Sequence, residues 1–415
     1  MKVELHLLQN FPPSNLNRDD TGQPKDTDFG GVRRARVSSQ CIKRSIRHSG
    51  PFERKFADRI ARRTKAVRDL LVPRLAAMGH DDEAARTVTV EMLRQTLGWD
   101  ASKGKDGLTS VLFYVGPEEL DRLAELMHEH AEAISAAVHT RRQLPEVAAK
   151  GDKKQQEGIK TADAAVSNAA KKVSDTFRAE RQGRVRSVDV ALFGRMLAQV
   201  PGMNIDAASQ VAHAVSTHAL DQDFDFYTAV DDRPAQDEDA EDRGAGMVGT
   251  TGFNASCYYR YALVDAEKLA ANLAEGADEV TAADRALAID VIAAFIAGAV
   301  EAIPTGKQNA FAAQTPPTLV MAVVRDGASA PWSLANAFVN PVAPGGERGI
   351  VAESVRRLDQ HWEALVDMYG DGDSRVFVKV AKDVGGLQHL APHGVANISA
   401  LVEGVTDSLR AWAEA

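Results

Sequence analysis

The sequence predicts a mixed α+β protein, because strand-like and helix-like segments alternate along it without a regular βα repeat. Three observations carry this prediction: a period-two pattern at the N-terminus, a long charged helical stretch in the first half, and two β-rich arms around an acidic segment in the second half. With 415 residues, 44% hydrophobic and 26% charged, the chain has the composition of a soluble globular protein of two or three structural units.

The N-terminal segment MKVELHLLQN alternates polar and apolar residues. Val3, Leu5 and Leu7 therefore predict a half-buried first strand, and the same alternation is unlike a signal peptide. Residues 10–31, rich in Pro, Asn, Asp and Gly, predict a long loop.

A second strand and a helix follow this loop. Val32–Val37 predicts the strand, with alternate side chains on opposite faces. Ser38 or Ser39 can cap a helix that runs to about His48 and stops at the Gly-Pro pair that follows.

The middle of the chain is mainly helical in pattern, from residue 52 to about 185. Within it, residues 149–179 are rich in Lys and Ala and poor in large apolar residues, which predicts either an exposed helix or a partly disordered insertion. Strand-like character returns at 185–194, and a helix is expected over about 205–219.

Two β-rich arms, at 223–232 and 247–264, flank an acidic, Gly-containing segment and predict a long hairpin-like protrusion. The elements expected beyond it are helices at about 280–302 and 351–368 and strands at 318–324 and 375–380. We expect the first strands to rejoin the later ones across the helical insertion.

A concentrated basic segment stands out in this acidic chain. The formal net charge is −9, yet residues 29–47 contain six Lys or Arg and no acid. Lys43 and Arg47 are four residues apart on the predicted helix, where two like charges destabilise it by about 0.2–0.5 kcal/mol. A bound phosphate would neutralise them, and a capped helix start offers N–H groups to an anion. The alternative is a solvated face, or pairing with the acids of residues 19–28.

Cys41 and Cys257 are the only cysteines, so the sequence predicts neither a disulfide framework nor a zinc cage, and no cofactor. No apolar run reaches the ~18 residues that a membrane span needs. We therefore expect a cytoplasmic protein without membrane contact, in which any polyanion site is a local patch.

Several separate motifs, in order, resemble the CasC family, the repeated backbone subunit of the type I-E CRISPR surveillance complex Cascade. They are LNRDD, KD followed by FGG, RRARVSSQ and KRSIR near the N-terminus, and VAHAVSTHALDQDFDFYTAVDD, YYRYA, KQNAFAA and SLANAF further on. The resemblance is close over about the first fifty residues and roughly 185–340, and weak over 52–184 and about the last fifty residues.

The resemblance implies a hand-shaped subunit with an RRM-like (ferredoxin-like) palm sheet, a helical fingers insertion and a long β-hairpin-like thumb. The boundaries expected on this basis are palm at 1–50, 185–219 and 256–415, fingers at 51–184 and thumb at 220–255, with C-terminal helices in the last palm segment.

The resemblance further implies a protein that binds CRISPR RNA and polymerises head-to-tail along it in antiviral defence. The thumb of each copy displaces a guide base at regular intervals, and the guide segments between pair with the target DNA strand. The implied partners are copies of the same chain and the capping, small and large subunits of Cascade. Such a protein holds the sugar–phosphate backbone of the guide RNA, while base pairing between guide and target carries the sequence information.

The resemblance also implies three groups of site residues. Basic loop residues face the guide or the neighbouring copy, a patch on the first helix grips the guide backbone, and apolar residues abut or wedge the guide bases. An aromatic wedge can replace a lost base stack worth ~1–3 kcal/mol. The expected RNA-binding residues are Arg18, Lys25, Arg34, Arg36, Ser38, Gln40, Lys43, Arg47, Met196, Phe226, Tyr227, Thr228 and Val248.

Two aromatic groups also have an ordinary structural explanation. Without the resemblance, Phe224, Phe226 and Tyr227 would be expected to pack the hairpin against its own subunit. The tyrosines of YYRYA, at 258–261, are expected to be sheet residues rather than a stacking platform.

No catalytic motif is complete, so we expect a protein that is not an enzyme. MHEHAE at 127–132 has Glu where a zincin needs its second His, and PTGKQNA lacks the upstream glycine of a P-loop. His213 and His218 are expected to be structural. The alternative function is a metal-dependent endoribonuclease that holds Mg²⁺ with the acids of one loop, Asp19, Asp20, Asp26 and Asp28.

Two segments depart from the family pattern. Seven acids lie between Asp231 and Asp242, at the expected thumb tip, and we expect them to point away from the phosphates or toward a basic partner subunit. The Lys-rich stretch at 150–172 is expected to belong to the fingers and to touch DNA phosphates, a hypothesis based on its charge alone.

Overall fold

The structure is a computed structural model that describes residues 1–96, 108–109, 112–143, 152–181, 184–197, 203–229, 247–274, 279–345 and 347–414. The chain divides into two compact units. The sheet unit comprises Met1–Lys55, Gln210–Ala266 and Ile289–Ala415, and the helical unit comprises Phe56–Ser209 and Glu267–Ala288. Helices and strands mix along the chain without a βα repeat, which confirms the α+β prediction.

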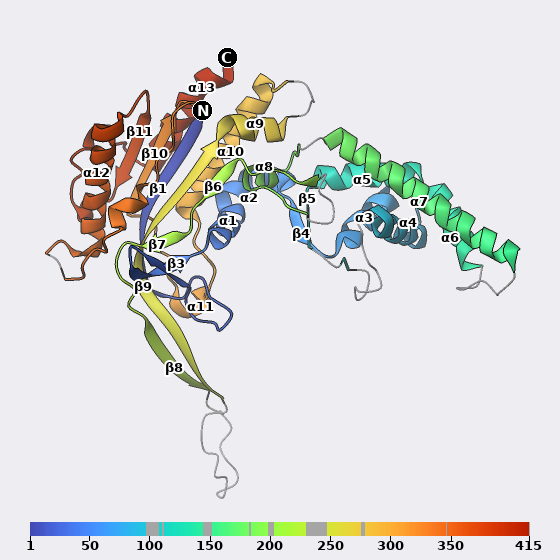
Figure 1. The fold of residues 1–415 in the computed structure, drawn as a ribbon, viewed down its shortest axis with the longest axis horizontal. Coiled ribbons are helices and arrows are strands. Elements are labelled where there is room, and N and C mark those ends of the chain that lie inside the picture. The colour runs from blue at the N-terminus through green and yellow to red at the C-terminus, as the bar shows by residue number, and fades with distance from the viewer. Residues whose placement is uncertain are drawn as a thin grey trace, which may run out of the picture. The chain divides into compact units, whose positions relative to one another are not determined.

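The sheet unit is built on a sheet of strand order β11-β10-β1-β9-β7-β3-β2, to which β6 and β8 add by pairing with β9 (Figure 1). The first strand pairs antiparallel with β9 and β10, so it rejoins the later strands as predicted. The strands are β1 (Lys2–Ser14), β2 (Asp26–Phe29), β3 (Val32–Val37), β6 (Ser209–Val211), β7 (Ala214–Ser216), β8 (Asp223–Ala229), β9 (Met247–Asp265), β10 (Leu319–Arg325) and β11 (Arg375–Val380).

β1 is buried on both faces, whereas its alternation predicted a half-buried strand. Glu4 and His6 alternate with apolar residues, yet both are fully buried. An ion pair with Arg325 offsets the charge of Glu4, and His6 Nδ1 lies 2.9 Å from Tyr259 Oη. A central strand with helices on both faces has no solvent side, so its polar residues need buried partners.

Helices cover the two faces of this sheet. On one face α12 packs against β11, where Val376 shares an apolar core with Trp362. On the other face α13 packs so closely on Phe377 that a Cβ at Gly404 would collide with its ring. The helices of the unit are α1 (Ser39–Arg47), α2 (Gly50–Phe56), α10 (Ala282–Glu301, from Ile289 onward), α11 (Gln308–Phe311), α12 (Gly349–Tyr369) and α13 (Ile398–Glu414).

The N-terminal elements follow the sequence with two corrections. β3 has the predicted bounds, and α1 ends at Arg47, one residue before the predicted end at about His48. The Gly50-Pro51 pair does not end that helix but begins α2. Strands β1 and β2 occupy parts of the expected loop at 10–31, which leaves residues 15–25 as the loop that we call the 15–25 loop.

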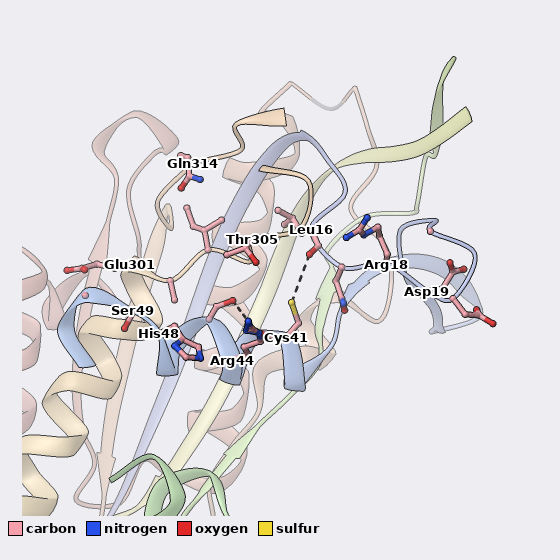
Figure 2. Close-up of a pocket in the computed structure, with 18 residues that line it drawn as sticks. Leu16, Arg18, Asp19, Cys41, Arg44, His48, Ser49, Glu301, Thr305 and Gln314 are labelled. Carbon is pink, nitrogen blue, oxygen red and sulfur yellow. Dashed lines mark hydrogen bonds between the residues drawn. The ribbon is translucent and has the colours of Figure 1, made fainter. Parts of the chain in front are cut away.

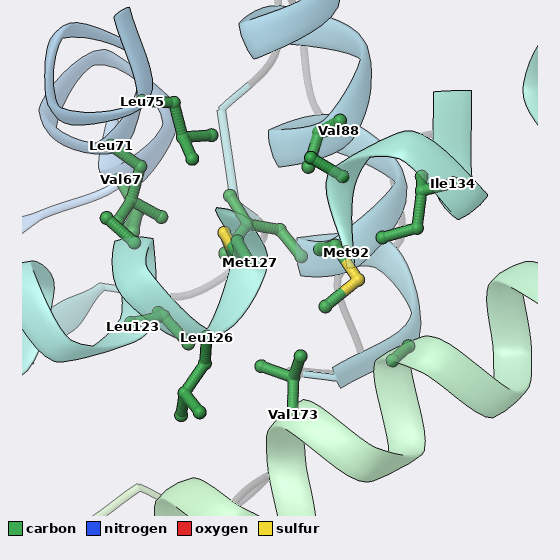
Figure 3. Packing of buried hydrophobic residues seen from close by; sticks show 14 of the residues in the cluster. Val67, Leu71, Leu75, Val88, Met92, Leu123, Leu126, Met127, Ile134 and Val173 are labelled. Carbon is green, nitrogen blue, oxygen red and sulfur yellow. The ribbon is translucent and has the colours of Figure 1, made fainter. Parts of the chain in front are cut away.

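Most helices of the helical unit, from α3 to α7, pack around one apolar core (Figure 3). Leu71, Met92, Met127 and Val173 come from four different helices and are each 0% exposed. The elements are α3 (Val67–Ala77), α4 (Asp82–Thr96), α5 (Pro117–Glu129), α6 (Ala131–Arg142), α7 (Lys153–Arg181), α8 (Val188–Phe193) and α9 (Ala266–Leu273), with a two-stranded sheet of β4 (Arg62–Thr64) and β5 (Phe113–Val115). Among the described residues, none of the helices combines the length and the apolar character that a membrane crossing requires.

The Lys-rich stretch forms the helix α7, the first of the two predicted alternatives. One side of α7 is buried, through residues such as Val166 and Phe177, and is part of the unit's core. The lysines at 153, 154, 171 and 172 are exposed on the rest of its surface. The preceding residues, 144–151, lie outside the described residues.

Residues 185–219 differ from the prediction in element type. α8 replaces the expected strand, because its Asp189 is satisfied by tertiary partners: Oδ1 accepts from the Ala61 N–H at 2.9 Å and Oδ2 from Tyr114 Oη at 2.7 Å. β6 and β7 replace the expected helix, since β7 is paired on both sides, with β3 and β9. Residues 185–209 fall in the helical unit, although we expected them in the sheet unit.

The two β-rich arms form the predicted hairpin. β8 pairs with β9 from Asp223 opposite Phe253 to Ala229 opposite Met247. β9 continues into the main sheet, and the hairpin extends beyond the sheet's other strands (Figure 1). The acidic segment between Asp231 and Asp242 lies outside the described residues.

Candidate nucleic-acid interface

The basic helix α1 is fixed by a cap and by two buried isoleucines. Ser38 Oγ accepts a hydrogen bond from the Cys41 N–H at 3.4 Å, which satisfies one backbone donor of the first turn. Ile42 and Ile46 are buried beneath the helix. The Ser38 N–H donates to Asn17 Oδ1 at 2.8 Å and ties the helix start to the 15–25 loop.

The expected backbone-gripping patch occupies one flank of α1. Gln40 is exposed, and Lys43 and Arg47, which follow on successive turns, are half-buried. Burial lowers the pKa of Lys43, because desolvation disfavours its charged form. A phosphate at this flank would stabilise the charged lysine and offset the repulsion between the two cations.

A second face of α1 lines an open cavity of about 900 Å³, and the sequence prediction missed it (Figure 2). Cys41, Arg44, Ser45 and His48 line it from successive helix turns, and Arg18 lines it from the 15–25 loop. Their helical spacing within the basic segment is the signal that would have identified this face. Further lining residues are Asp19, Asp20, Glu301, Thr305 and Gln314.

In the 15–25 loop Arg18 is exposed, whereas the side chain of its neighbour Asp19 is hydrogen-bonded within its own turn. Asp19 Oδ1 accepts hydrogen bonds from the Thr21 N–H, the Thr21 hydroxyl and the Gln23 N–H at 2.9, 2.8 and 2.9 Å. The Thr21 hydroxyl and these backbone donors lower the pKa of Asp19. Lys25, at the end of the loop, is half-buried.

The acids considered for a Mg²⁺ site are not gathered together. Asp26 and Asp28 lie on β2 and pair with Arg33 at 2.6 and 3.2 Å. Asp19 is engaged in its own turn, as described above. Among the residues that the structure describes, no three His, Cys, Asp or Glu side chains group as metal ligands.

Two arginines of the expected set are held by the protein itself. Arg34 is 0% exposed, and its guanidinium donates to the carbonyl oxygens of Ser216 and Phe338, both at 2.9 Å. It has no surface to offer a phosphate, which corrects its place in the expected set. Arg36 is half-buried and donates to Asp26 O and His213 Nδ1, both at 3.0 Å.

The hairpin residues of the expected set lie on β8 and β9. Phe226 and Tyr227 are 65% and 40% exposed, so the described part of the chain does not pack over them. The ring of Tyr227 covers Gly249, where a Cβ would come within 2.5 Å of it. Thr228 is exposed and pairs with Val248, whose side chain lies outside the description.

Met196 lies in the helical unit and is 85% exposed. The residues on either side of it, Arg195 and Leu197, are buried. Arg195 is anchored by Glu119, which accepts from its Nη1 and Nη2 at 2.8 and 2.9 Å. The exposed thioether is therefore held between two buried residues, which suits a contact with planar bases.

Of the residues expected to be structural, Tyr258, Tyr259 and His218 are buried, whereas His213 is exposed. Tyr258 and Tyr259 are 3% and 5% exposed, which confirms that they are sheet residues. His218 is buried too, and its Nε2 accepts from the Cys257 N–H at 3.2 Å.

The fold is similar to that of chains in solved structures. Among the many chains of solved structures that match are two that align with almost the whole chain. One, from a "CRISPR RNA-guided surveillance complex, pre-nicking", has 29% identity and a TM-score of 0.79, and the match covers 99% of this chain and 100% of that chain. The other, from a "CRISPR RNA-guided surveillance complex", has 26% identity and a TM-score of 0.67, with 98% and 100% covered.

Of the two sequence comparisons, only the one with protein families gave a match. No curated protein matches the sequence significantly. The profile of the CT1975-like protein family matches residues 3–404. Because that match spans nearly the whole sequence, the chain belongs to the CT1975-like protein family.

Proposed function

We propose that this chain is a CRISPR RNA-binding backbone subunit of a type I-E Cascade complex in the cytoplasm. The observation that carries the proposal is the similarity, over the full length of both chains, to subunits of RNA-guided surveillance complexes. In this proposal copies of the chain polymerise head-to-tail along one guide as an open filament that capping subunits end, and small and large subunits complete the complex.

Two features of the sheet unit support a role in holding a single strand. The flank of α1 with Gln40, Lys43 and Arg47 offers hydrogen-bond donors and positive charge to phosphates. The hairpin offers the exposed rings of Phe226 and Tyr227 to bases. The hairpin displaces a guide base at regular intervals, and the guide between the displaced bases pairs with target DNA.

The proposed subunit acts without catalysis. The engagement of Asp19 in a turn, and of Asp26 and Asp28 with Arg33, supports this part of the proposal. Incubation of the purified complex with target RNA and Mg²⁺ is the test. Cuts at a regular spacing would contradict a purely scaffolding role.

Co-purification tests the central proposal. The tagged chain is expressed with its companion subunits and a cognate CRISPR array, and the nucleic acid that emerges with it is sized and sequenced. We expect a short RNA of uniform length that carries array sequence. Emergence of no RNA, or of mixed cellular RNA without array sequence, would overturn the proposal.

A further inference from the structure

Two phenylalanines lie uncovered on one face of the β8–β9 hairpin. Phe224 and Phe226 are 62% and 65% exposed. Their cross-strand partners are Gly252 and Thr250, which are too small to cover an aromatic ring. A two-stranded hairpin is marginally stable in water by itself, and large apolar side chains left bare on it indicate a binding surface.

The opposite face of the hairpin is covered at its base by the chain itself. Thr251 is 8% exposed, and its hydroxyl accepts from Lys307 Nζ at 2.7 Å. The ring of Phe253 lies 5.6 Å from that of Phe311. Asp225 belongs to this covered face because it pairs with Thr251, so its carboxylate is directed away from the phenylalanines.

The face with the phenylalanines begins beside the 15–25 loop. Asn15 Nδ2 donates to Gly252 O at 3.0 Å, and the Gln23 side chain occupies the space where a Cβ of Gly252 would project. Since Gly252 pairs with Phe224, the loop lies at the base of the same face. The loop carries two cations of the expected RNA-binding set. Exposed rings beside cations are the combination by which proteins hold single-stranded nucleic acid.

We propose that Phe224 and Phe226 form a clamp that holds one base of a single-stranded RNA between their rings. Alternate residues on one face of a strand are about 6.4–6.8 Å apart. That separation is about twice the 3.4 Å spacing of stacked nucleotides, so one base fits with a ring on each side. The clamp rests on the proposed function and adds Phe224 to it. It gives the hairpin a means of retaining a displaced base as well as separating its neighbours.

Fluorescent RNA and conservative variants test the clamp. The full-length chain is titrated with short single-stranded RNAs, each carrying one 2-aminopurine at a successive position, and affinity is measured by filter binding. Phe224→Leu keeps the apolar bulk and removes the aromatic face, whereas Phe224→Tyr keeps that face. Met368→Ala is the matched control, because it removes a side chain that is 71% exposed on α12.

The clamp predicts a result specific to aromatic rings. Phe224→Leu should weaken RNA affinity by about 5- to 150-fold and relieve the quenching of 2-aminopurine at the clamped position. Phe224→Tyr and Met368→Ala should retain the affinity and the quenching of the unmodified chain. Full affinity and quenching in Phe224→Leu would overturn the clamp.

Three further outcomes would also decide against it. Unchanged RNA binding with reduced RNA-free self-association in Phe224→Ala would show that the phenylalanines dock on a second copy of the chain. RNA binding that depends on Lys43 and Arg47 but not on Phe224 would overturn the clamp and leave the proposed function in place. Failure of the unmodified chain to bind RNA would overturn both.

Discussion

Neighbouring arginines on β3 have different environments. Arg33 is exposed and pairs with Asp26 and Asp28, whereas Arg34 is buried and donates to backbone carbonyl oxygens. The same residue type thus supplies a surface ion pair at one position and a core hydrogen-bond network at the next. Residue type alone does not distinguish these roles, because they depend on which side of the strand faces the core.

Removal of the buried arginine should destabilise the fold. Arg34→Met leaves the carbonyl oxygens of Ser216 and Phe338 without their donors, at a cost of about 3 kcal/mol. Arg33→Met is the matched control, and because its ion pairs are exposed to solvent it should destabilise the fold far less. Urea unfolding of both variants checks this, and equal losses of unfolding free energy would contradict the assignment of Arg34 to the core.

His218 should make the stability of the sheet unit depend on pH. Burial, first, and the charge of Arg34 lower its pKa from the ordinary 6.5. Its Nδ1 donates to Ala219 O at 2.8 Å, and its Nε2 accepts from the Cys257 N–H, so only the neutral ring fits. Above pH 6.5 both folded and unfolded states are neutral and stability is complete. As the pH falls below that value, the unfolded state binds a proton that the folded state resists, and stability decreases.

A variant separates this effect from other titrations. His218→Gln removes the ring, so the fall in unfolding free energy between pH 7.5 and pH 5.5 should become smaller than in the unmodified chain. Chemical denaturation at the two pH values measures it. The same pH dependence in both proteins would contradict the linkage.

At the scale of one element, α1 and its C-cap present basic residues on two faces. Lys43 and Arg47 follow the flank expected from the sequence, and Arg44 and His48 line the cavity. Both faces are set by the burial of Ile42 and Ile46 on the side of the helix that faces the sheet unit's core. The flank and the cavity can therefore be tested separately.

Replacement of the flank cations should change the salt dependence of RNA binding. Lys43→Ala with Arg47→Ala should reduce the slope of log affinity against log salt by about 0.7 for each lost phosphate contact with a single strand. A control that removes exposed cations elsewhere, Lys382→Ala with Arg410→Ala, should leave the slope unchanged. Filter binding over a range of salt concentrations decides, and equal slopes in all three proteins would refute phosphate contact at this flank.

At the scale of the whole molecule, the proposed filament makes assembly depend on RNA length. A heterologous contact that does not close allows each further stretch of guide to recruit one more copy of the 44.6 kDa chain. Mass photometry with single-stranded RNAs of increasing length should show steps of that mass. The double variant of Lys43 and Arg47 should show fewer steps at the same protein concentration. A particle of constant mass at every RNA length would contradict an open filament.

Local patterns were enough for much of the fold and part of the site. Alternation predicted β3, the cap and the isoleucine spacing predicted α1, and the apolar runs around an acidic segment predicted the β8–β9 hairpin. The basic flank of α1 followed from spacing within a single helix. These features depend on residues that are close in sequence, so the sequence determines them directly.

Only the tertiary structure decided the rest, because the deciding partners are distant in the sequence. Glu4 is buried in β1 because Arg325, 321 residues away, neutralises it. Arg34 is a core residue because the carbonyl oxygen of Phe338, 304 residues away, accepts a hydrogen bond from its guanidinium. The cavity beside α1 likewise needs the 15–25 loop and residues 301–314 to close around the helix. The sequence by itself determined β3, α1, the hairpin and the basic segment. The tertiary structure decided the element types within 185–219, where distant partners made a helix of the expected strand and strands of the expected helix, and it decided which charges remain at the surface to meet a ligand.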